Sequence, residues 1–247
     1  MQNPFSLEGK TILVTGASAG IGKAIAISCA GMGAKVCITA RNQKRLEETM
    51  SQMEGEGHLL FIADLSLQEE IKTLVNGLPQ LDGIIHCAGV GSRILCKSIN
   101  KESIDYVFIP NFQAPVLLQS ALLSQKKVNK SASIVFIASR ASESPSIGNA
   151  IYSASKGAII SYAKCLGLEL APRLIRVNCI CPAMVWTDLI IQDGTSKEDL
   201  EQAQLKYPLK RYGQPEDIAN LCLYLLSDAS SWMTGSCIDI TGGAKEL

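Results

Sequence analysis

The chain of 247 residues has little that would indicate a metal site, a disulfide framework or a membrane span. It has two histidines, and they do not stand at the spacing of a metal-ligand pair. Its nine cysteines are odd in number and scattered, and no Cys-x-x-Cys pair occurs, which argues against zinc and against disulfides. No stretch approaches the roughly 20 continuous apolar residues that a membrane-spanning helix requires.

An excess of charge of one sign is also missing. The 23 basic and 23 acidic side chains balance, so composition gives no reason to expect nucleic acid or a membrane as partner. The first ten residues have no basic region followed by an apolar stretch, so no signal peptide is expected. These features favour a cytoplasmic protein with reduced, buried thiols, since five cysteines fall within apolar runs: Cys37, Cys87, Cys179, Cys181 and Cys237.

Short runs rich in Val and Ile alternate with helical patterns along the chain. Strands are expected over residues 11–15, 35–40, 59–63, 83–87, 133–138, 176–181 and 236–240. Helices are expected over residues 20–32, 43–53, 67–76, 101–127, 150–170 and 215–227. Because the runs are apolar on both sides of the strand, the predicted sheet is parallel and buried on both faces. No linker divides the chain, so residues 1–247 are predicted to form a single α/β domain, a doubly wound parallel sheet of about seven strands with helices on both faces.

Residues 184–212 interrupt this alternation with a long segment of weak periodicity. Such segments in compact domains are usually binding loops or lids, and this one would lie beside the carboxyl ends of the strands. An apolar set at its start predicts a pocket wall: Met184, Trp186, Leu189, Ile190 and Ile191. We expect the segment to become ordered over a bound substrate; the alternative is a fixed pair of short helices.

A glycine-rich turn follows the first predicted strand directly. It reads Thr15-Gly16-Ala17-Ser18-Ala19-Gly20-Ile21-Gly22, and a helix begins there. Glycines permit a tight turn and a close approach of the backbone to phosphate, while the helix N-terminus offers unpaired N–H groups. The spacing Gly-x-x-x-Gly-x-Gly differs from the dinucleotide fingerprint Gly-x-Gly-x-x-Gly, but its place between strand and helix predicts a nucleotide site.

The end of the second predicted strand indicates which nicotinamide cofactor binds. An acidic residue about 20 positions beyond the glycines would bind the ribose hydroxyls of NAD. This chain has Ala40 there, followed by Arg41 and Asn42. An uncharged position beside a guanidinium suits a 2′-phosphate, so NADP(H) is predicted over NAD(H). The alternative is that Arg41 only opens the next helix at the surface.

Tyr152 and Lys156 stand four residues apart, on one face of a predicted helix. A phenol is a poor proton donor near neutral pH because its ordinary pKa is about 10, and a nearby positive charge favours the phenolate form. The two side chains are therefore a candidate general acid/base. The same spacing also occurs by chance on helices that have no catalytic role.

Taken together, these motifs make the chain resemble the short-chain dehydrogenase/reductase family over nearly its whole length. The matching features stand in the family's order: Thr15-Gly16-x-x-x-Gly20-Ile21-Gly22, Asp64, Ala88-Gly89, Asn111, Ser139, Tyr152-x-x-x-Lys156, Pro182 with Thr187, and Gly242-Gly243. The resemblance implies a Rossmann-type fold and an oxidoreductase that interconverts a ketone and a secondary alcohol with NADP(H). It implies no metal.

The resemblance also assigns roles. Tyr152 would protonate the substrate carbonyl, Lys156 would favour the ionised phenol and hold the nicotinamide ribose, and Ser139 would hydrogen-bond the same carbonyl. Asn111 would hold a water that links Lys156 to solvent. Asp64 would contact the adenine and Thr187 the nicotinamide carboxamide. The full implied cofactor set is Gly16, Ser18, Gly20, Ile21, Gly22, Arg41, Asn42, Asp64, Leu65, Ala88, Gly89, Tyr152, Lys156, Pro182, Val185 and Thr187.

Two departures from the family pattern stand beside the expected site. The family commonly has Asn-Asn-Ala-Gly where this chain has His86-Cys87-Ala88-Gly89, and Pro-Gly where it has Pro182-Ala183. We expect His86 to make a structural hydrogen bond rather than to take a third catalytic role. Ala183 is expected to make the backbone approach to the nicotinamide slightly less close.

Within the family, the chain looks most like 3-oxoacyl-(acyl-carrier-protein) reductases. This implies an acyl-thioester carbonyl substrate and a possible carrier protein docked on Lys126, Lys127 and Arg173. Alternatives are a small-molecule hydroxysteroid, sugar or polyol substrate, or a non-catalytic cofactor-binding regulator.

Family members of this size are usually tetramers, so the resemblance implies a homotetramer. Helices 101–127 and 150–170 would pair at one interface, and residues 236–247 would form another. An apolar set is consistent with a second buried face on these helices: Val116, Leu117, Ala121, Ile159, Ile160, Ala163 and Leu166.

Overall fold

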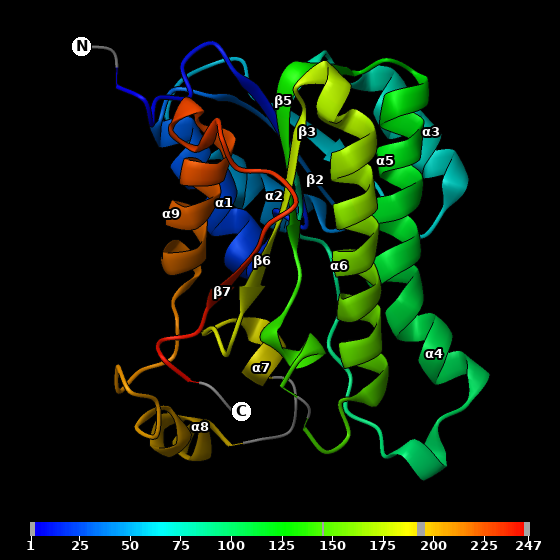
Figure 1. Cartoon of the computed structure of the whole chain (residues 1–247), viewed down its shortest axis with the longest axis vertical. Coiled ribbons are helices and arrows are strands. Elements are labelled where there is room, and N and C mark those ends of the chain that lie inside the picture. Colours follow the sequence, from blue (N-terminus) through cyan, green and yellow to red (C-terminus); the bar gives the residue numbers. More distant parts are fainter. Residues whose placement is uncertain (1–2, 145, 192–195, 245–247) are drawn as a thin grey trace.

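The computed structural model describes residues 3–144, 146–191 and 196–244, which form a seven-stranded parallel sheet. The strand order is β3-β2-β1-β4-β5-β6-β7 (Figure 1). This confirms the predicted α/β fold. The strands are β1 (Thr11–Thr15), β2 (Lys35–Ala40), β3 (Leu59–Ile62), β4 (Leu81–His86), β5 (Val128–Ile137), β6 (Arg176–Pro182) and β7 (Cys237–Ile240).

Helices cover both faces of the sheet (Figure 1). One face carries α1 (Gly20–Gly31), α2 (Gln43–Met50) and α9 (Pro215–Leu226), and the other carries α3 (Gln68–Gly77), α5 (Ala114–Ser124) and α6 (Ala150–Leu170). Successive side chains of a strand point to opposite faces. Ile12 and Val14 of β1 therefore join the core under α1, while Leu13 joins the core under α5 and α6.

The direction of winding reverses at β1, because β2 and β3 lie on one side of it and β4 on the other. In open α/β sheets, ligands bind in the crevice that this reversal leaves at the carboxyl ends of the strands. Three short helices lie at the same end of the molecule: α4 (Lys101–Phe108), α7 (Asp188–Ile191) and α8 (Lys197–Gln204) (Figure 1).

The helix predicted over residues 101–127 is one helical rod with a change of pitch. A π-helical turn, Ile109–Gln113, separates α4 from α5. Pro110 and Pro115 have no backbone N–H, so the regular hydrogen bonds from each N–H to the carbonyl four residues earlier are interrupted there. By length and composition, Lys101–Ser124 could cross a membrane, since its most apolar 18 residues have a mean hydropathy of 1.2, but a helix of a protein core passes the same test. Leu118 and Leu122 of this rod are fully buried in the core.

Two predictions about strands were wrong in detail. The edge strand β3 is not buried on both faces, since Leu59 and Ile62 are 40% and 52% exposed where the helices cover the sheet less completely. Strand β5 begins at Val128, before the predicted start, and its register against β4 shifts between Leu81 and Gly83. Ser131, with φ 64°, lies in the part of β5 that was not predicted, where the register shift marks a bulge. The polar residues of this bulge interrupt the apolar pattern, so the sequence did not indicate a strand there.

The cysteines are all free thiols. Cys37, Cys179 and Cys181 are buried in the sheet as expected, whereas Cys87 and Cys237 are half-buried. Burial raises the pKa of Cys37 to about 12, which makes this thiol unreactive at neutral pH. Within the described parts of the chain, no group of three His, Cys, Asp or Glu side chains could hold a metal ion.

His86, at the end of β4, is a buried structural residue. Its Nε2 lies 3.0 Å from Oε1 of Gln119 on α5, and its ring stacks on Phe136 with centroids 4.5 Å apart. The expected structural hydrogen bond is thereby confirmed. Among the described residues, His86 Nδ1 has no hydrogen-bond partner, so a proton added there would bury an uncompensated charge. Burial lowers the pKa of His86 to about 4, although the bond to Gln119 opposes the change.

This depressed pKa predicts a loss of stability in mild acid. In the unfolded chain, His86 takes up a proton near the ordinary pKa of about 6.5, so between about pH 6.5 and 4 the unfolded state binds more protons. The stabilising contribution is full above that window and is lost as pH falls through it, by up to roughly 3 kcal/mol. His86→Asn should flatten the fall in melting temperature between pH 7 and 5. Parallel curves for the parent and the variant would contradict the assignment.

Candidate active site

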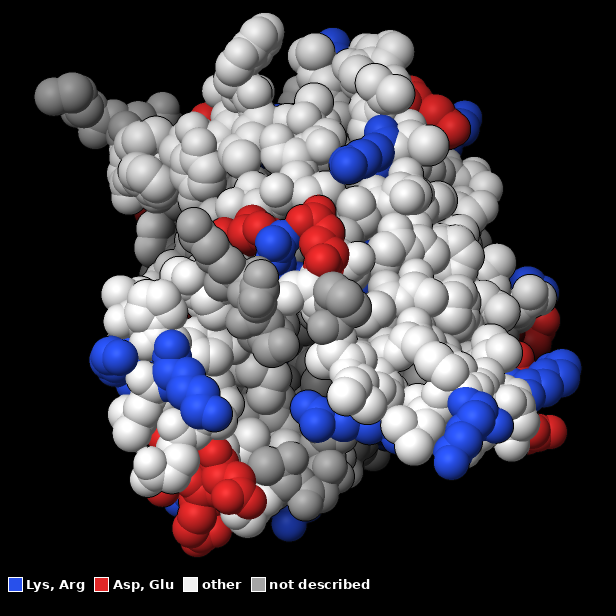
Figure 2. Space-filling view, turned by 60° about the horizontal axis from the view of Figure 1, so that its bottom comes forward, with Lys and Arg blue, Asp and Glu red and all other residues white. Residues whose placement is uncertain are grey.

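A single cleft of about 1150 Å³ opens at the carboxyl ends of the strands and brings most of the predicted residues together. Figure 2 shows the molecule turned so that this end comes forward, with positive and negative side chains scattered around a central hollow. Predicted residues that line the cleft are Gly16, Ser18, Gly20, Ile21, Gly22, Arg41, Asp64, Leu65, Ala88, Gly89, Ser139, Tyr152, Lys156, Pro182, Val185 and Thr187.

The glycine turn is packed too closely for side chains. A Cβ at Gly22 would stand 2.3 Å from the Gly16 carbonyl oxygen, and one at Gly16 would stand 2.8 Å from Ala88 Cα. Gly16 and Gly20 also have φ values of 68° and 51°, in the region that favours glycine. Helix α1 begins here with no acidic residue in its first turn and no side-chain cap, so its free N–H groups can bind phosphate.

Thr15 holds the turn against the neighbouring strand, a role that the sequence motif does not reveal. Its Oγ1 accepts hydrogen bonds from the backbone N–H of Cys87 at 3.0 Å and of Ala88 at 3.1 Å. The same hydroxyl donates to the Ile85 carbonyl at 3.3 Å. The ends of β1 and β4 are thus joined by one buried side chain.

At the adenosine end, Arg41 extends from the end of β2 with its side chain 72% exposed. Its Nη1 lies 3.8 Å from Oδ2 of Asp64. Partial burial would raise the pKa of Asp64, but hydrogen bonds from the Ser66 hydroxyl and N–H, together with the Arg41 charge, lower it below its ordinary value. Asn42 does not line the cleft: its side chain caps α2 by accepting the Arg45 N–H at 3.0 Å.

At the other end, Tyr152 and Lys156 project from the first turns of α6 into the cleft. Lys156 is 7% exposed, and its Nζ donates to the Ile137 carbonyl at 2.9 Å and lies 5.8 Å from the Tyr152 ring centre. Ser139 follows β5, and its Oγ accepts the Ala141 N–H at 3.1 Å, which leaves the hydroxyl proton available to a ligand.

Asn111 lies in the π-helical turn and is buried beside the cleft. Its Nδ2 donates to the Val90 carbonyl at 3.0 Å and to Ser155 Oγ at 3.1 Å, and its Oδ1 accepts the Val90 N–H at 2.8 Å. Both amide hydrogens are therefore in use within the protein. The expected water would have to bind other atoms of this turn, and π-helical turns are frequent at functional sites.

The segment after β6 forms the remaining wall. Met184, Leu189 and Ile190 line the cleft, in agreement with the expected apolar wall, while the side chain of Ile191 and residues 192–195 lie outside the described part. Thr187 packs on the glycine turn: a Cβ at Gly20 would stand 3.1 Å from its Cγ2. The expected closure of this segment stays a prediction, and α7 and α8 are the short helices of the alternative.

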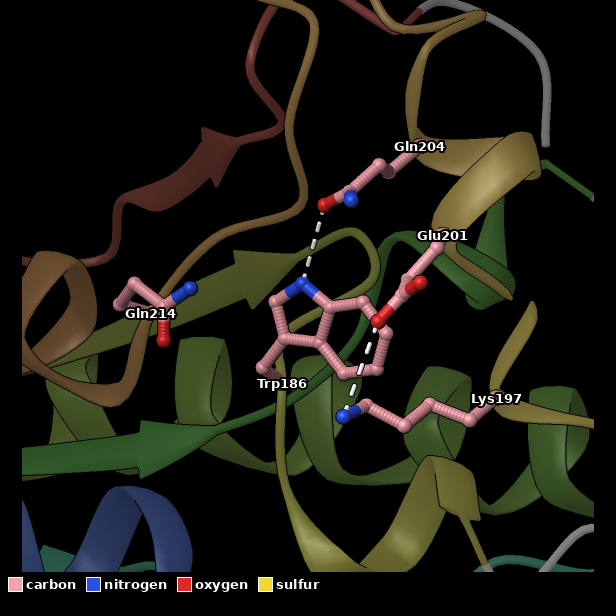
Figure 3. Close-up of a pocket in the computed structure, with 5 residues that line it drawn as sticks. All are labelled: Trp186, Lys197, Glu201, Gln204 and Gln214. Carbon is pink, nitrogen blue, oxygen red and sulfur yellow. Dashed lines mark hydrogen bonds and ion pairs between the residues drawn. The ribbon is translucent and has the colours of Figure 1, made fainter. Parts of the chain in front are cut away.

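Trp186 points away from the cleft, contrary to its expected place in the pocket wall. Its indole lies in a separate hollow of about 450 Å³ with Lys197, Glu201, Gln204 and Gln214 (Figure 3). The indole N–H donates to Gln204 Oε1 at 3.0 Å. This contact anchors α8 to the segment that carries Val185 and Thr187.

The three basic residues expected to receive a carrier protein lie at the amino ends of the strands, whereas Tyr152 lies at the carboxyl ends. Lys126 and Lys127 directly precede β5 and Arg173 precedes β6, whereas the cleft lies where these strands end. Lys127 donates to the Leu78 carbonyl, and Arg173 donates to the Val128 carbonyl at 2.6 Å. They therefore do not flank the cleft.

Comparison with known proteins identifies the family. The model of a family described as enoyl-(acyl carrier protein) reductase matches residues 16–245. The chain is 34% identical over 239 residues to a 3-oxoacyl-(acyl-carrier-protein) reductase of Rickettsia felis, covering 97% of this chain and 98% of that protein. It is 35% identical over 246 residues to an L-xylulose reductase of Caenorhabditis elegans, covering 97% of each. The chain belongs to the short-chain dehydrogenase/reductase family.

Solved structures agree with this assignment. A dehydrogenase/reductase from Sinorhizobium meliloti superposes with a TM-score of 0.90 at 31% identity, covering 98% of this chain and 97% of that one. A putative gluconate 5-dehydrogenase from Beutenbergia cavernae with bound NADP gives 0.87 at 29% identity, covering 98% of both chains. A 3-ketoacyl-(acyl-carrier-protein) reductase from Brucella melitensis complexed with NADH gives 0.86 at 28% identity, covering 96% and 99%.

Membership of this family makes the chain an oxidoreductase that acts on CH–OH or C=O groups with a nicotinamide cofactor. The residues present fit such a cofactor. The cradle at Gly16 and Gly22 excludes a Cβ, the start of α1 offers free N–H groups, and Lys156 lies in the same cleft.

This cradle predicts the effect of one added methyl group. Gly22→Ala should weaken binding of the nicotinamide dinucleotide at least tenfold, about 1.4 kcal/mol, because the new Cβ meets the Gly16 carbonyl and neither backbone can yield. Isothermal titration calorimetry measures this affinity. Gly31→Ala is the matched control at the other end of α1, since a Cβ there meets nothing within 4 Å. Equal affinities for both variants would contradict the cradle.

Proposed function

We propose that this protein is an NADP(H)-dependent oxidoreductase that reduces a ketone with NADPH and, in reverse, dehydrogenates the corresponding secondary alcohol with NADP+, with Tyr152 as general acid/base. The observation that supports it is the convergence of Ser139, Tyr152 and Lys156 with the glycine cradle in one cleft. A non-catalytic cofactor-binding regulator has no need of this acid, and a complete set of acid, ammonium and hydroxyl therefore favours turnover.

Each side chain has a distinct task in the proposed reduction. The nicotinamide cofactor supplies the hydride when it is bound. The Tyr152 hydroxyl gives its proton to the carbonyl oxygen as negative charge develops there, and the Ser139 hydroxyl donates a hydrogen bond to the same oxygen. Lys156, whose Nζ donates to the Ile137 carbonyl, holds a positive charge 5.8 Å from the centre of the Tyr152 ring, where it attracts the negative charge that Tyr152 carries once its proton has been transferred.

NADP(H) is proposed over NAD(H) because positive charge gathers where the adenosine ribose would lie. Arg41 and Arg45 both line that end of the cleft, and the neighbouring Ala40 offers no carboxylate to the ribose hydroxyls. The relatives do not decide between the two, since one neighbour binds NADP and another NADH.

A 3-oxoacyl thioester is the proposed substrate, with an acyl carrier protein as a possible partner and the cytoplasm as location. The name of the Rickettsia relative and the apolar wall of Met184, Leu189 and Ile190 support a substrate with an acyl chain. A sugar or polyol is the second candidate, favoured by the L-xylulose reductase. A hydroxysteroid is also compatible with the apolar wall.

We also propose a homotetramer. Ile159, Ala163 and Leu166 of the expected apolar set face the sheet and are buried. Val116, Leu117, Ala121 and Ile160 are not fully buried, and Ile104, Tyr106 and Leu168 add exposed apolar surface to the same helices. Such a face on α4, α5 and α6 suits pairing with a second copy. The second interface of the proposed tetramer is the one expected at residues 236–247, of which 245–247 lie outside the described part of the chain.

Loss of the phenol hydroxyl tests the proposed chemistry. Tyr152→Phe should lower kcat for a 3-oxoacyl thioester by about 10²–10⁴-fold, because the proton donor is lost, while the affinity for NADPH changes little. The rate is followed by the absorbance of the reduced nicotinamide. Tyr162→Phe, on the same helix but packed against Phe136, should retain the parent rate. Near-parent turnover by Tyr152→Phe would refute the role of Tyr152.

Cofactor choice is tested separately. NADPH should bind at least tenfold more tightly than NADH, since one charge-assisted hydrogen bond contributes about 1.5–3 kcal/mol. Arg41→Ala should remove most of this ratio, and Lys44→Ala, an exposed cation on α2 outside the cleft lining, should leave it unchanged. Equal affinities of the parent protein for the two cofactors would overturn the NADP(H) assignment.

A further inference from the structure

Two arginines at the adenosine end of the cleft are each held by one carboxylate. Arg41 Nη1 lies 3.8 Å from Asp64 Oδ2, and Arg45 Nη1 lies 3.3 Å from Asp188 Oδ2. The second pair joins residues 143 positions apart in the sequence. Since Arg45 is on α2 and Asp188 opens α7, this ion pair connects two different walls of the cleft.

The segment that carries Asp188 already lies across the cofactor cradle. Thr187, the preceding residue, touches the glycine turn at the position where a Gly20 side chain would stand, 3.1 Å from a Cβ there. The next residue along the chain, Asp188, forms the ion pair with Arg45. The segment at the start of α7 therefore contacts the start of α1 through Thr187 and the first turn of α2 through Asp188.

The first turn of α2 carries Arg45, which lines the same cleft as Arg41. Asn42 Oδ1 accepts the Arg45 N–H at 3.0 Å and fixes this turn at the end of β2. A guanidinium binds a carboxylate and a phosphate with the same planar fork of N–H donors. The Asp188 carboxylate therefore occupies a place on Arg45 that phosphate oxygens could take.

We propose that Arg45 is a second ligand of the 2′-phosphate of NADP(H), and that Asp188 is the counter-ion it exchanges for that phosphate. This inference rests on the proposed use of NADP(H). With side chains 52% and 58% exposed, the Arg45–Asp188 pair is solvated and weak enough to exchange. NAD(H) brings no 2′-phosphate, so it leaves the pair intact. Asp188 thus lowers the preference for NADP(H), and the exchange frees α7, which carries Leu189 and Ile190 of the substrate wall, from α2.

Dissociation constants for NADPH and NADH test the exchange in three variants. Asp188→Asn should tighten NADPH binding about two- to fivefold, because no ion pair has to break, and leave NADH binding unchanged. Arg45→Gln should weaken NADPH binding at least about fivefold and leave NADH binding unchanged. In the double variant, the effect of Asp188→Asn should disappear, since its partner is absent.

Glu47→Gln is the charge-matched control. It removes an exposed carboxylate from α2, and residues two apart on a helix do not face each other, so it should not reproduce the effect of Asp188→Asn. An equal gain for NADPH and NADH, or a gain that persists in the Arg45→Gln background, would overturn the inference. If the parent protein binds both cofactors equally, the NADP(H) assignment fails instead; if it prefers NADPH and these variants change nothing, only the exchange fails.

Discussion

The close approach of three backbone segments at the glycine turn is the constraint on which the rest of the site depends. Gly16 lies against Ala88, and Gly22 lies against Gly16, with no room for a Cβ at either glycine. The Thr15 hydroxyl fastens the same point by bonding the backbone of Cys87 and Ala88. This contact sets the start of α1 beside the end of β4, at the reversal of the sheet where a dinucleotide can lie.

The end of the cleft that contains Tyr152 and Lys156 depends on buried polar groups that are hydrogen-bonded to one another. Asn111 bonds the backbone of Val90 and the hydroxyl of Ser155, which in turn donates to the Tyr152 carbonyl at 2.7 Å. Lys156 is tied to β5 through the Ile137 carbonyl. The loop after β4, the π-helical turn and α6 are therefore connected, and side chains held in this way need little rearrangement when a carbonyl arrives.

Much of this arrangement could be predicted from the sequence. Strand positions follow from short apolar runs rich in Val and Ile, and helix positions from a period of 3.6 residues, and both patterns depend only on near neighbours in the chain. For the same reason, the glycine turn and the Tyr152–Lys156 spacing predict a cofactor cradle and an acid/base pair before any fold is known. The predictions that were wrong in detail depended on surroundings that the local pattern does not show. Strand β3 is exposed because it lies at an edge of the sheet, and Pro110 and Pro115 change the pitch of the helix.

Contacts between distant residues were decided by the tertiary structure alone. The sequence does not show that Arg45 meets Asp188, that His86 bonds Gln119, or that Thr187 touches Gly20. The sequence by itself determined the order of the strands and helices and the glycine turn, and it predicted the acid/base pair. Which charges face each other, and across which wall, was decided by how the helices and loops pack around the parallel sheet.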